Sequence, residues 1–253
     1  MNRILVTLCG RAGSKGFKNK NLKVFCGRPL VYYSLSAIQL FLQKRGDVQA
    51  DVVLNTDSPE LRELVLAKYG FVHPIERPGE LAGDKVAKLA VFRHSLAVME
   101  AETGRPYDVH MDFDITSPLR TLADVEGVLN TYLARDDLDV VMSAAKSRRS
   151  PFMNMGKREG NYVRQVIQTD ITARQGAPVC YDINASLYAF RPAFLQGNTT
   201  GRVWDGRCEV YEMEDTGVLD IDSEEDFHLM EAVAGYLFET RPAFAEIRDN
   251  IGE

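Results

Sequence analysis

The sequence predicts an α/β protein with a three-layer, Rossmann-like architecture and a mostly parallel central sheet. Short apolar segments rich in β-branched residues alternate with longer segments of helical periodicity, which is typical of a sheet covered by helices on both faces. The 253 residues are 45% hydrophobic and 26% charged, a globular composition that supports a full core. We therefore expect a single domain over residues 1–253.

The N-terminal segment predicts a strand, a loop and a helix in that order. Residues Arg3–Cys9 (RILVTLC) are apolar and include β-branched Ile, Val and Thr, as in a buried parallel strand. Residues 10–21 are polar and contain three glycines, which indicates a loop. Pro29 then begins a helix over 29–43, in which apolar residues return every three or four positions.

The same alternation continues to the C-terminus. Ser58 is a suitable N-cap for the second helix, and Ser223 followed by two glutamates begins the last one, over 223–237. Residues 217–222 (GVLDID) are expected to form the closing strand of the core. The other expected strands lie at 50–54, 71–75, 107–113, 140–144 and 185–190, and the other helices at 86–99 and 123–133.

One stretch, about 145–182, breaks this alternation. It mixes charged residues, turn signals and short β-like pieces (SRRSPFMNMGKREGNYVRQV is its centre). We interpret it as a β-rich insertion between the two ends of one domain, and expect it to serve as an oligomerisation arm.

Bulk properties exclude several classes of protein. The formal net charge is −6 without a long Lys/Arg run, which disfavours nucleic-acid binding. No apolar stretch approaches the ~18 residues that a membrane span needs. The four cysteines are widely spaced without a CxxC pair, which favours reduced thiols. We expect a cytoplasmic protein with no nucleic-acid or membrane partner.

The loop at 10–21 concentrates positive charge at the carboxyl end of the first strand, where open α/β sheets bind ligands. Its glycines allow several backbone N–H groups to converge on one anion. The order Ser14-Lys15-Gly16 differs from a Walker A loop, and the GxxGxxG spacing differs from the dinucleotide fingerprint. We predict a phosphate-binding loop of another kind; the alternative is a solvated turn with surface lysines. Its cations are Arg11, Lys15, Lys18 and Lys20.

The loop, Arg11-x-Gly13-Ser14-Lys15-Gly16-x-x-x-Lys20-Asn21, resembles the RxGSKGxxxKN signature of the acylneuraminate cytidylyltransferases, the CMP-sialic acid synthetase family. Further matches extend over nearly the whole chain. They are Gly27-Arg28-Pro29-Leu30, Asn55-Thr56-Asp57, Arg77-Pro78-x-Glu80-Leu81-Ala82-x-Asp84, Thr116-Ser117-Pro118-Leu119-Arg120 and Asp220-Ile221-Asp222.

The resemblance implies an enzyme that transfers CMP from CTP to the anomeric hydroxyl of a nonulosonic (sialic-type) acid and releases pyrophosphate. It also implies Mg²⁺ as cofactor and a homodimer formed through the arm. The nucleotide-binding residues would be Arg11, Gly13, Ser14, Lys15, Lys20, Asn21, Arg77 and Asp84. Catalysis would depend on Arg11, Lys15, Lys20 and Asp222, since charge neutralisation is the main protein contribution to phosphoryl-type transfer.

Two carboxylates, Asp220 and Asp222, are candidates for the metal site. Two positions apart in a strand, they would point to the same face, and Mg²⁺ prefers hard oxygen ligands completed by phosphates. The alternative is that one of them caps the helix that begins at Ser223.

The sugar-binding residues implied by the resemblance are Asp114, Thr116, Ser117, Arg174, Gln175, Asp182 and Asn184. Two of them depart from the sialic-acid enzymes: Asp114 stands where that family has Gln, and Asp182 where it has Arg. An acidic residue at 182 disfavours plain N-acetylneuraminate as the sugar. The pattern is closer to bacterial homologues that act on legionaminic or pseudaminic acid.

Other interpretations remain open from the sequence. Asp112 is either part of a second carboxylate pair with Asp114 or a loop contact. Lys85 and Lys88 are expected at the surface, with additional phosphate contacts as the alternative. The chain could instead be a nucleotidyltransferase for an eight-carbon ulosonic acid or a sugar phosphate, or a non-catalytic nucleotide-binding protein.

Overall fold

A seven-stranded sheet forms the centre of the molecule in the computed structural model, which describes residues 1–13, 16–216 and 220–252. The strand order is β11-β7-β10-β6-β1-β4-β5, and β10 alone runs antiparallel to its neighbours. The strands are β1 Asn2–Gly10, β4 Val48–Thr56, β5 Val72–Glu76, β6 Val109–Phe113, β7 Val140–Lys146, β10 Tyr181–Phe190 and β11 Cys208–Glu212.

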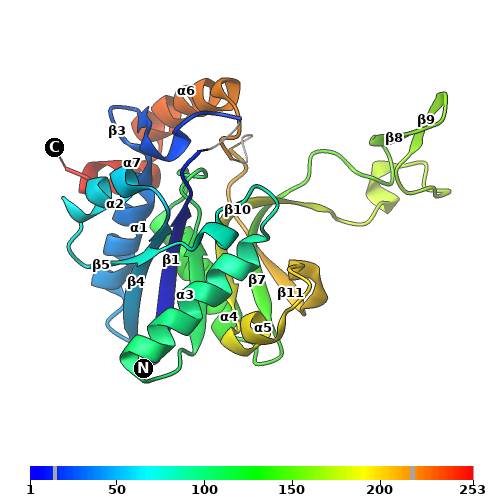
Figure 1. The fold of residues 1–253 in the computed structure, drawn as a ribbon. Helices are drawn as coiled ribbons and strands as arrows, with labels where there is room; N and C mark the ends of the chain where they lie inside the picture. The colour runs from blue at the N-terminus through cyan, green and yellow to red at the C-terminus, as the bar shows by residue number, and fades with distance from the viewer. Residues whose placement is uncertain (14–15, 217–219, 253) are drawn as a thin grey trace.

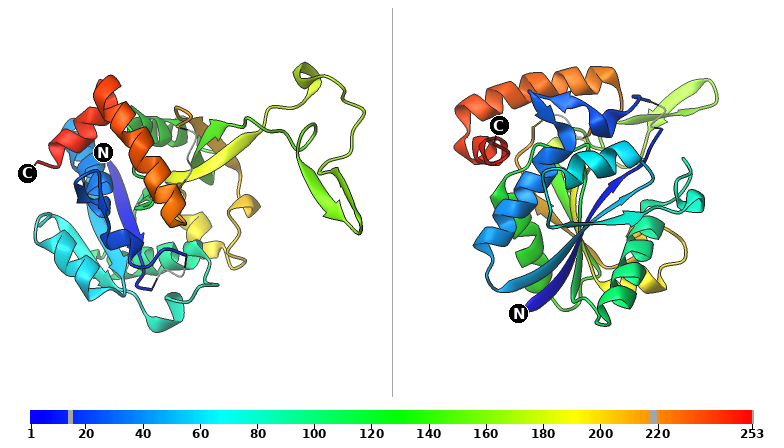
Figure 2. Two further views of the ribbon diagram at one scale, coloured as in Figure 1. Left: turned by 90° about the horizontal axis from the view of Figure 1, so that it is seen from above. Right: turned by 60° about the vertical axis from the view of Figure 1, so that its left-hand side comes forward.

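Helices cover both faces of this sheet (Figures 1 and 2). One face packs against α1 Leu30–Lys44, α2 Pro59–Leu66, α4 Leu122–Leu133, α6 Glu224–Thr240 and α7 Pro242–Asn250, and the other against α3 Lys88–Thr103 and α5 Pro192–Gly197. The three-layer α/β prediction is confirmed. Among the described residues, no helix combines the length and apolarity needed to cross a bilayer.

The first strand shows why the core has two halves. Ile4, Val6 and Leu8 pack into the larger hydrophobic cluster, whereas Leu5 points to the smaller one beneath α3. All four side chains are fully buried. Alternating side chains of one strand thus bury both faces of the sheet, as a parallel strand between two helical layers must.

The helix starts follow the capping residues of the sequence. Ser58 accepts a hydrogen bond from the Leu61 backbone N–H at the start of α2. Ser223 and Asp226 form a capping box that begins α6. These caps satisfy backbone donors that have no partner inside the helix.

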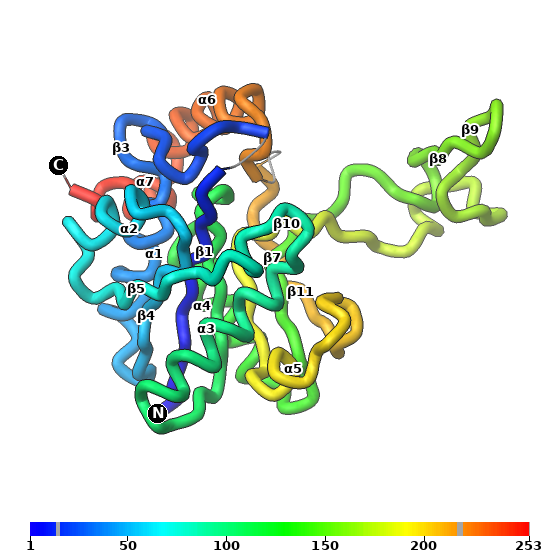
Figure 3. The backbone as a smooth tube through the Cα atoms, viewed as in Figure 1, coloured from blue at the N-terminus to red at the C-terminus, as the bar shows by residue number. Residues whose placement is uncertain are grey.

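The arm leaves the body of the molecule between β7 and β10, as the tube in Figure 3 shows. It carries the hairpin of β8 Gly156–Glu159 and β9 Tyr162–Gln165 and the short 3₁₀ helix η3 Arg174–Gly176. Figures 1 and 2 show it projecting away from both helical layers.

The closing strand was predicted in the wrong place. Within 217–222, residues 217–219 lie outside the described residues, and 220–222 form no strand. The last strand of the sheet in chain order is instead β11, Cys208–Glu212, an edge strand that pairs with β7. Its sequence, CEVYE, is half polar because an edge strand is only partly covered, so its apolar pattern is weak.

Candidate active site

A pocket of about 440 Å³ opens at the carboxyl ends of β1 and β6. The loop after β1, the short helix η1 Lys20–Leu22 and the segment before α3 form its walls. This is the position at which open α/β sheets bind ligands. Six of the sequence-predicted nucleotide and catalytic residues that the structure describes line it, and they are Arg11, Lys20, Asn21, Arg77, Asp84 and Asp222.

The glycine loop contacts neighbouring loops through a backbone hydrogen bond of Ala12 and an ion pair of Arg11. The Arg11 guanidinium forms an ion pair with Asp84, and the Ala12 backbone N–H donates to Asp57 Oδ1 at 2.8 Å. Gly13 has φ of +70°, which favours glycine. Ser14 and Lys15 lie outside the described residues. Asp84 therefore lies beside the cation that is expected to hold phosphate.

Lys20 joins the loop to the segment before α6. Its Nζ donates to the Ile221 carbonyl at 2.6 Å and contacts Asp222 Oδ1 at 3.0 Å. At Gly16 an added Cβ would lie 2.6 Å from the Asp222 carbonyl oxygen. The two segments are thus in direct contact, although about 200 residues separate them in sequence.

The two candidate metal ligands occupy different environments. Burial raises the pKa of Asp220, and the nearby Asp222 carboxylate raises it further. The Asp222 side chain is 76% exposed and pairs with Lys20. Helix α6 is capped by Ser223 and Asp226, so the capping alternative for Asp220 and Asp222 is not supported.

Arg77 directly follows β5, and its side chain is held by Asn55 near the end of β4. Its Nε donates to Asn55 Oδ1 at 2.9 Å and its Nη2 to the Asn55 carbonyl at 2.8 Å. Asn55 is fully buried and donates in turn to Ser95 Oγ at 3.0 Å. These bonds place the guanidinium in the pocket wall, where only 7% of the residue is exposed.

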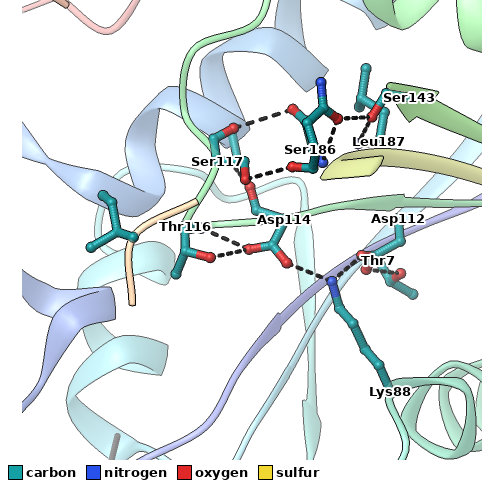
Figure 4. Close-up of polar contacts among 12 residues, drawn as sticks. Thr7, Lys88, Asp112, Asp114, Thr116, Ser117, Ser143, Ser186 and Leu187 are labelled. Carbon is teal, nitrogen blue, oxygen red and sulfur yellow. Dashed lines mark hydrogen bonds and ion pairs between the residues drawn. The ribbon is translucent and has the colours of Figure 1, made fainter. Parts of the chain in front are cut away.

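A charged cluster lies at the end of β6 (Figure 4). The Lys88 ammonium is 2.7 Å from a carboxylate oxygen of Asp112 and 2.7 Å from one of Asp114. Thr116 donates to Asp114 Oδ1 through its backbone N–H at 2.8 Å and its hydroxyl at 2.7 Å. The Thr7 hydroxyl donates to Asp112 Oδ1 at 2.9 Å.

These contacts shift the pKa values of Asp112 and Asp114 in opposite directions. Burial opposes ionisation of both. At Asp114, Lys88 and Thr116 outweigh burial and hold the pKa well below its usual range. At Asp112, burial dominates and raises the pKa. Asp114 therefore serves as a fixed hydrogen-bond acceptor and is a poor proton acceptor at neutral pH.

The expectation that Lys88 lies at the surface was wrong. It is the first residue of α3 and its side chain lines the pocket, whereas Lys85 is exposed. The predicted helix began at residue 86, which concealed that Lys88 starts the first turn. The nearby Asp112 and Asp114, at the end of a buried strand, were the signal that a cation was required there.

Sequence-predicted sugar residues fall into three places. Asp114 and Thr116 line the pocket. Ser117 and Asn184 are buried behind it, where the Ser117 hydroxyl donates to the Asn184 carbonyl at 3.1 Å. Asn184 Oδ1 also accepts from Ser143 Oγ at 2.6 Å. Ser117 and Asn184 thus hold the loop after β6 against β10.

The remaining three lie in the arm or at its base. Arg174 and Gln175 lie in η3, and Asp182 lies on β10 opposite Ala145 of β7. Arg174 lines a second cavity of about 350 Å³ at the base of the arm. Within one chain, these residues do not join the pocket at β1 and β6.

The pocket offers cations and hydrogen-bond donors but no histidine among its described residues. Burial raises the pKa of the Cys9 thiol, with Asp112 adding to the effect, so this thiol stays protonated. His110 is fully buried beneath the site, and burial lowers its pKa to about 3. The arrangement is suited to binding and neutralising a polyphosphate rather than to covalent nucleophilic catalysis.

Two solved structures with the same fold are named as enzymes that use or form cytidine nucleotides. A CMP:2-keto-3-deoxy-manno-octonic acid synthetase complexed with CTP aligns with TM-score 0.64 and 15% identity, covering 92% of this chain and 99% of that one. A 4-diphosphocytidyl-2C-methyl-D-erythritol synthase from Anaerococcus prevotii aligns with TM-score 0.58 and 16% identity, covering 91% and 97%. At these identities the likeness establishes the fold.

Sequence comparison reaches further. The Cytidylyltransferase family matches residues 6–102. The chain is 34% identical to post-translational flagellin modification protein B of Campylobacter coli and 33% identical to CMP-N,N'-diacetyllegionaminic acid synthase of Campylobacter jejuni. Each alignment covers 91% of this chain and 94% of the relative. With the glycine loop, Lys20 and Asp222 gathered at one pocket, the chain belongs to the cytidylyltransferase family and is a nucleotidyltransferase.

Proposed function

We propose that this protein transfers CMP from CTP to the anomeric hydroxyl of a nonulosonic acid and releases pyrophosphate. The observation that carries the proposal is the contact between the glycine loop and the segment before α6. This contact brings the Lys20 ammonium, a group that can bind phosphate, to 3.0 Å from the Asp222 carboxylate, a group that can bind a metal ion. Both residues line the same pocket.

Arg11 and Lys20 bind the triphosphate and neutralise charge on the leaving pyrophosphate. Both cations pair with carboxylates in this structure, Arg11 with Asp84 and Lys20 with Asp222. Phosphate oxygens are competing partners for the same guanidinium and ammonium groups. Gly13, Ser14, Lys15 and Asn21 complete the nucleotide site in this proposal, and Arg77 contacts the cytosine and ribose.

The donor set fits Mg²⁺ when the triphosphate is included. Asp222 is close enough to raise the pKa of Asp220, and a dication between the two carboxylates would remove that repulsion. No group of three or more His, Cys, Asp or Glu in the described part of the chain suits a metal, so phosphate oxygens and water would supply the remaining ligands. A bound Mg²⁺ would stabilise charge on the phosphates.

The sugar acid occupies the end of the pocket beside β6. There Asp114 and Thr116 offer a carboxylate and a hydroxyl. The cation at this end of the pocket, Lys88, is paired with Asp112 and Asp114. The similarity to the Campylobacter jejuni synthase supports a legionaminic-type acid. Asp182 is consistent with a sugar other than N-acetylneuraminate, since it places a carboxylate at the base of the arm.

We further propose a homodimer in which the arm of one copy reaches the pocket of the other. The second cavity contains Lys146, Arg148, Arg149 and Arg174, which are suited to an acidic sugar. The arm also exposes apolar side chains, including Tyr162 at 71% and Val163 at 64%. A second copy would cover these side chains and bring Arg174 and Gln175 to a sugar.

Pyrophosphate release tests the proposed function. The purified chain is incubated with Mg²⁺, CTP and a panel of 2-keto sugar acids that includes N,N'-diacetyllegionaminic acid and N-acetylneuraminate. We expect turnover with CTP and with the legionaminic-type acid, and none when UTP, ATP or GTP replaces CTP. CTP binding without pyrophosphate release from any sugar acid would contradict the proposal.

A further inference from the structure

Lys88 has its charged partners at the end of β6 and none in the glycine loop among the described residues. Its ammonium contacts Asp112 and Asp114 at 2.7 Å each, and its side chain is 35% exposed toward the pocket. Asp112 is fully buried. An ammonium between two carboxylates is held in position by both, whereas Arg11 and Lys20 each form an ion pair with one carboxylate.

Counting the buried charges shows why Lys88 cannot serve the triphosphate. Arg120 is fully buried and donates to the carbonyl oxygens of Asp114 and Ser117. The carboxylates of Asp112, Asp114 and Asp124 lie beside these cations. Three carboxylates outnumber Lys88 and Arg120, so the cluster has no surplus positive charge for a phosphate. If Lys88 moved to a phosphate, Asp112 and Asp114 would lose their ion pair, and an unpaired buried carboxylate is strongly unfavourable.

Asp114 is left with one open position for a ligand. Its Oδ1 accepts from the backbone N–H and the hydroxyl of Thr116, and its Oδ2 accepts from Lys88. A carboxylate has about four acceptor positions, and the Asp114 side chain is 18% exposed at the pocket wall. The open position accepts an O–H or N–H donor and repels a phosphate.

We propose that Lys88 is a positioning residue that holds Asp114 as a fixed acceptor for a hydroxyl or amide N–H of the sugar acid. The inference rests on the proposed function, because it names the part of the substrate that faces this wall. It assigns the β6 wall to the sugar acid and the loop after β1 to the triphosphate. A role of Lys88 in binding CTP, through phosphate or the cytosine amino group, is the competing assignment.

Steady-state kinetics with Lys88→Met separates the two assignments. With N,N'-diacetyllegionaminic acid as the varied substrate, we expect KM to rise about tenfold to a hundredfold, the range for losing a hydrogen bond to a charged group. KM for CTP should stay within about twofold. Lys88→Arg keeps the charge and should recover part of the loss. Lys85→Met, three residues away and exposed, is the matched control and should change neither constant.

A second variant covers the case in which Lys88→Met does not fold. Asp114→Asn leaves the pair between Lys88 and Asp112 intact, and we expect the same selective rise in KM for the sugar acid. A rise in KM for CTP alone, unchanged values of both constants, or a fall in kcat alone would each overturn the inference.

Calorimetric titration with CTP tests the role of Lys88 independently of catalytic activity. It requires no turnover, so it can be performed even if the wild type releases no pyrophosphate. Unchanged CTP affinity in Lys88→Met supports the assignment of Lys88 away from the nucleotide, and weakened affinity overturns it. Absence of turnover in the wild type contradicts the proposed function alone.

Discussion

Neighbouring residues of the same type can have different contacts in this protein. Lys20 and Lys18 are two residues apart, yet Lys20 reaches Ile221 and Asp222 whereas Lys18 is exposed. The charge pattern of the loop does not separate them, and the family resemblance selects Lys20 alone. The fold supplies the physical difference, because it brings a segment some 200 residues away to Lys20.

Lys20→Ala should lower kcat about a hundredfold or more, because it removes a cation from the phosphate side of the pocket. Lys18→Ala is the control and should retain wild-type activity. Pyrophosphate release under saturating CTP and sugar acid measures both. Equal losses in the two variants would mean that the loop contributes only diffuse positive charge.

Burial of the single residue His110 makes the free energy of unfolding depend on pH. Its folded pKa, lowered to about 3 by burial, lies below the ordinary value of 6.5. Below pH 6.5 the unfolded chain therefore binds a proton that the folded chain does not, so the free energy of unfolding falls as pH falls.

The expected loss from His110 approaches about 1.4 kcal/mol per pH unit between pH 6 and pH 4. His110→Phe retains an aromatic ring beside Phe92 and should remove this contribution. Urea unfolding of both proteins at several pH values measures the difference. Parallel pH profiles for wild type and variant would contradict the prediction.

At the scale of elements, most of the sheet follows from apolar periodicity, because strands buried on both faces are continuously apolar. β1, the centre of β4 and β7 were predictable for this reason. β11 was not, since it is a half-polar edge strand. The pocket wall with Arg11, Lys20 and Asn21 was predictable from the glycine loop. The pocket position of Lys88 and the burial of Ser117 and Asn184 were not, because they depend on contacts between distant segments.

The close approach of the glycine loop to the segment before α6 predicts a strong effect of Gly16→Ala. The added Cβ would lie 2.6 Å from the Asp222 carbonyl oxygen, a backbone atom that cannot rotate away. The loop must then separate from Lys20's partners, so we expect CTP affinity to fall at least tenfold. Gly79→Ala is the control, because nothing lies within 4 Å of the added atom and its φ is not positive. Calorimetric CTP titration checks both variants.

The whole molecule consists of a compact catalytic body and an arm that extends from it (Figures 1 and 3). The body contains the pocket with Lys20, Asp114 and Asp222. The arm contains Arg174 and a cationic cavity that shares no lining residue with that pocket. If both cavities serve one reaction, the complete site requires two copies of the chain.

Replacing Tyr162 by Asp tests this requirement. Tyr162 is 71% exposed on β9, and burying the introduced carboxylate against a second copy would be unfavourable. We expect the variant to elute as a monomer in size-exclusion chromatography with light scattering, and KM for the sugar acid to rise while CTP affinity is retained. Trp204→Asp, at a 62% exposed aromatic residue outside the arm, should leave the dimer and both constants unchanged. A Tyr162→Asp variant that remains dimeric, or a wild type that is monomeric at assay concentration, would show that the arm does not join two copies.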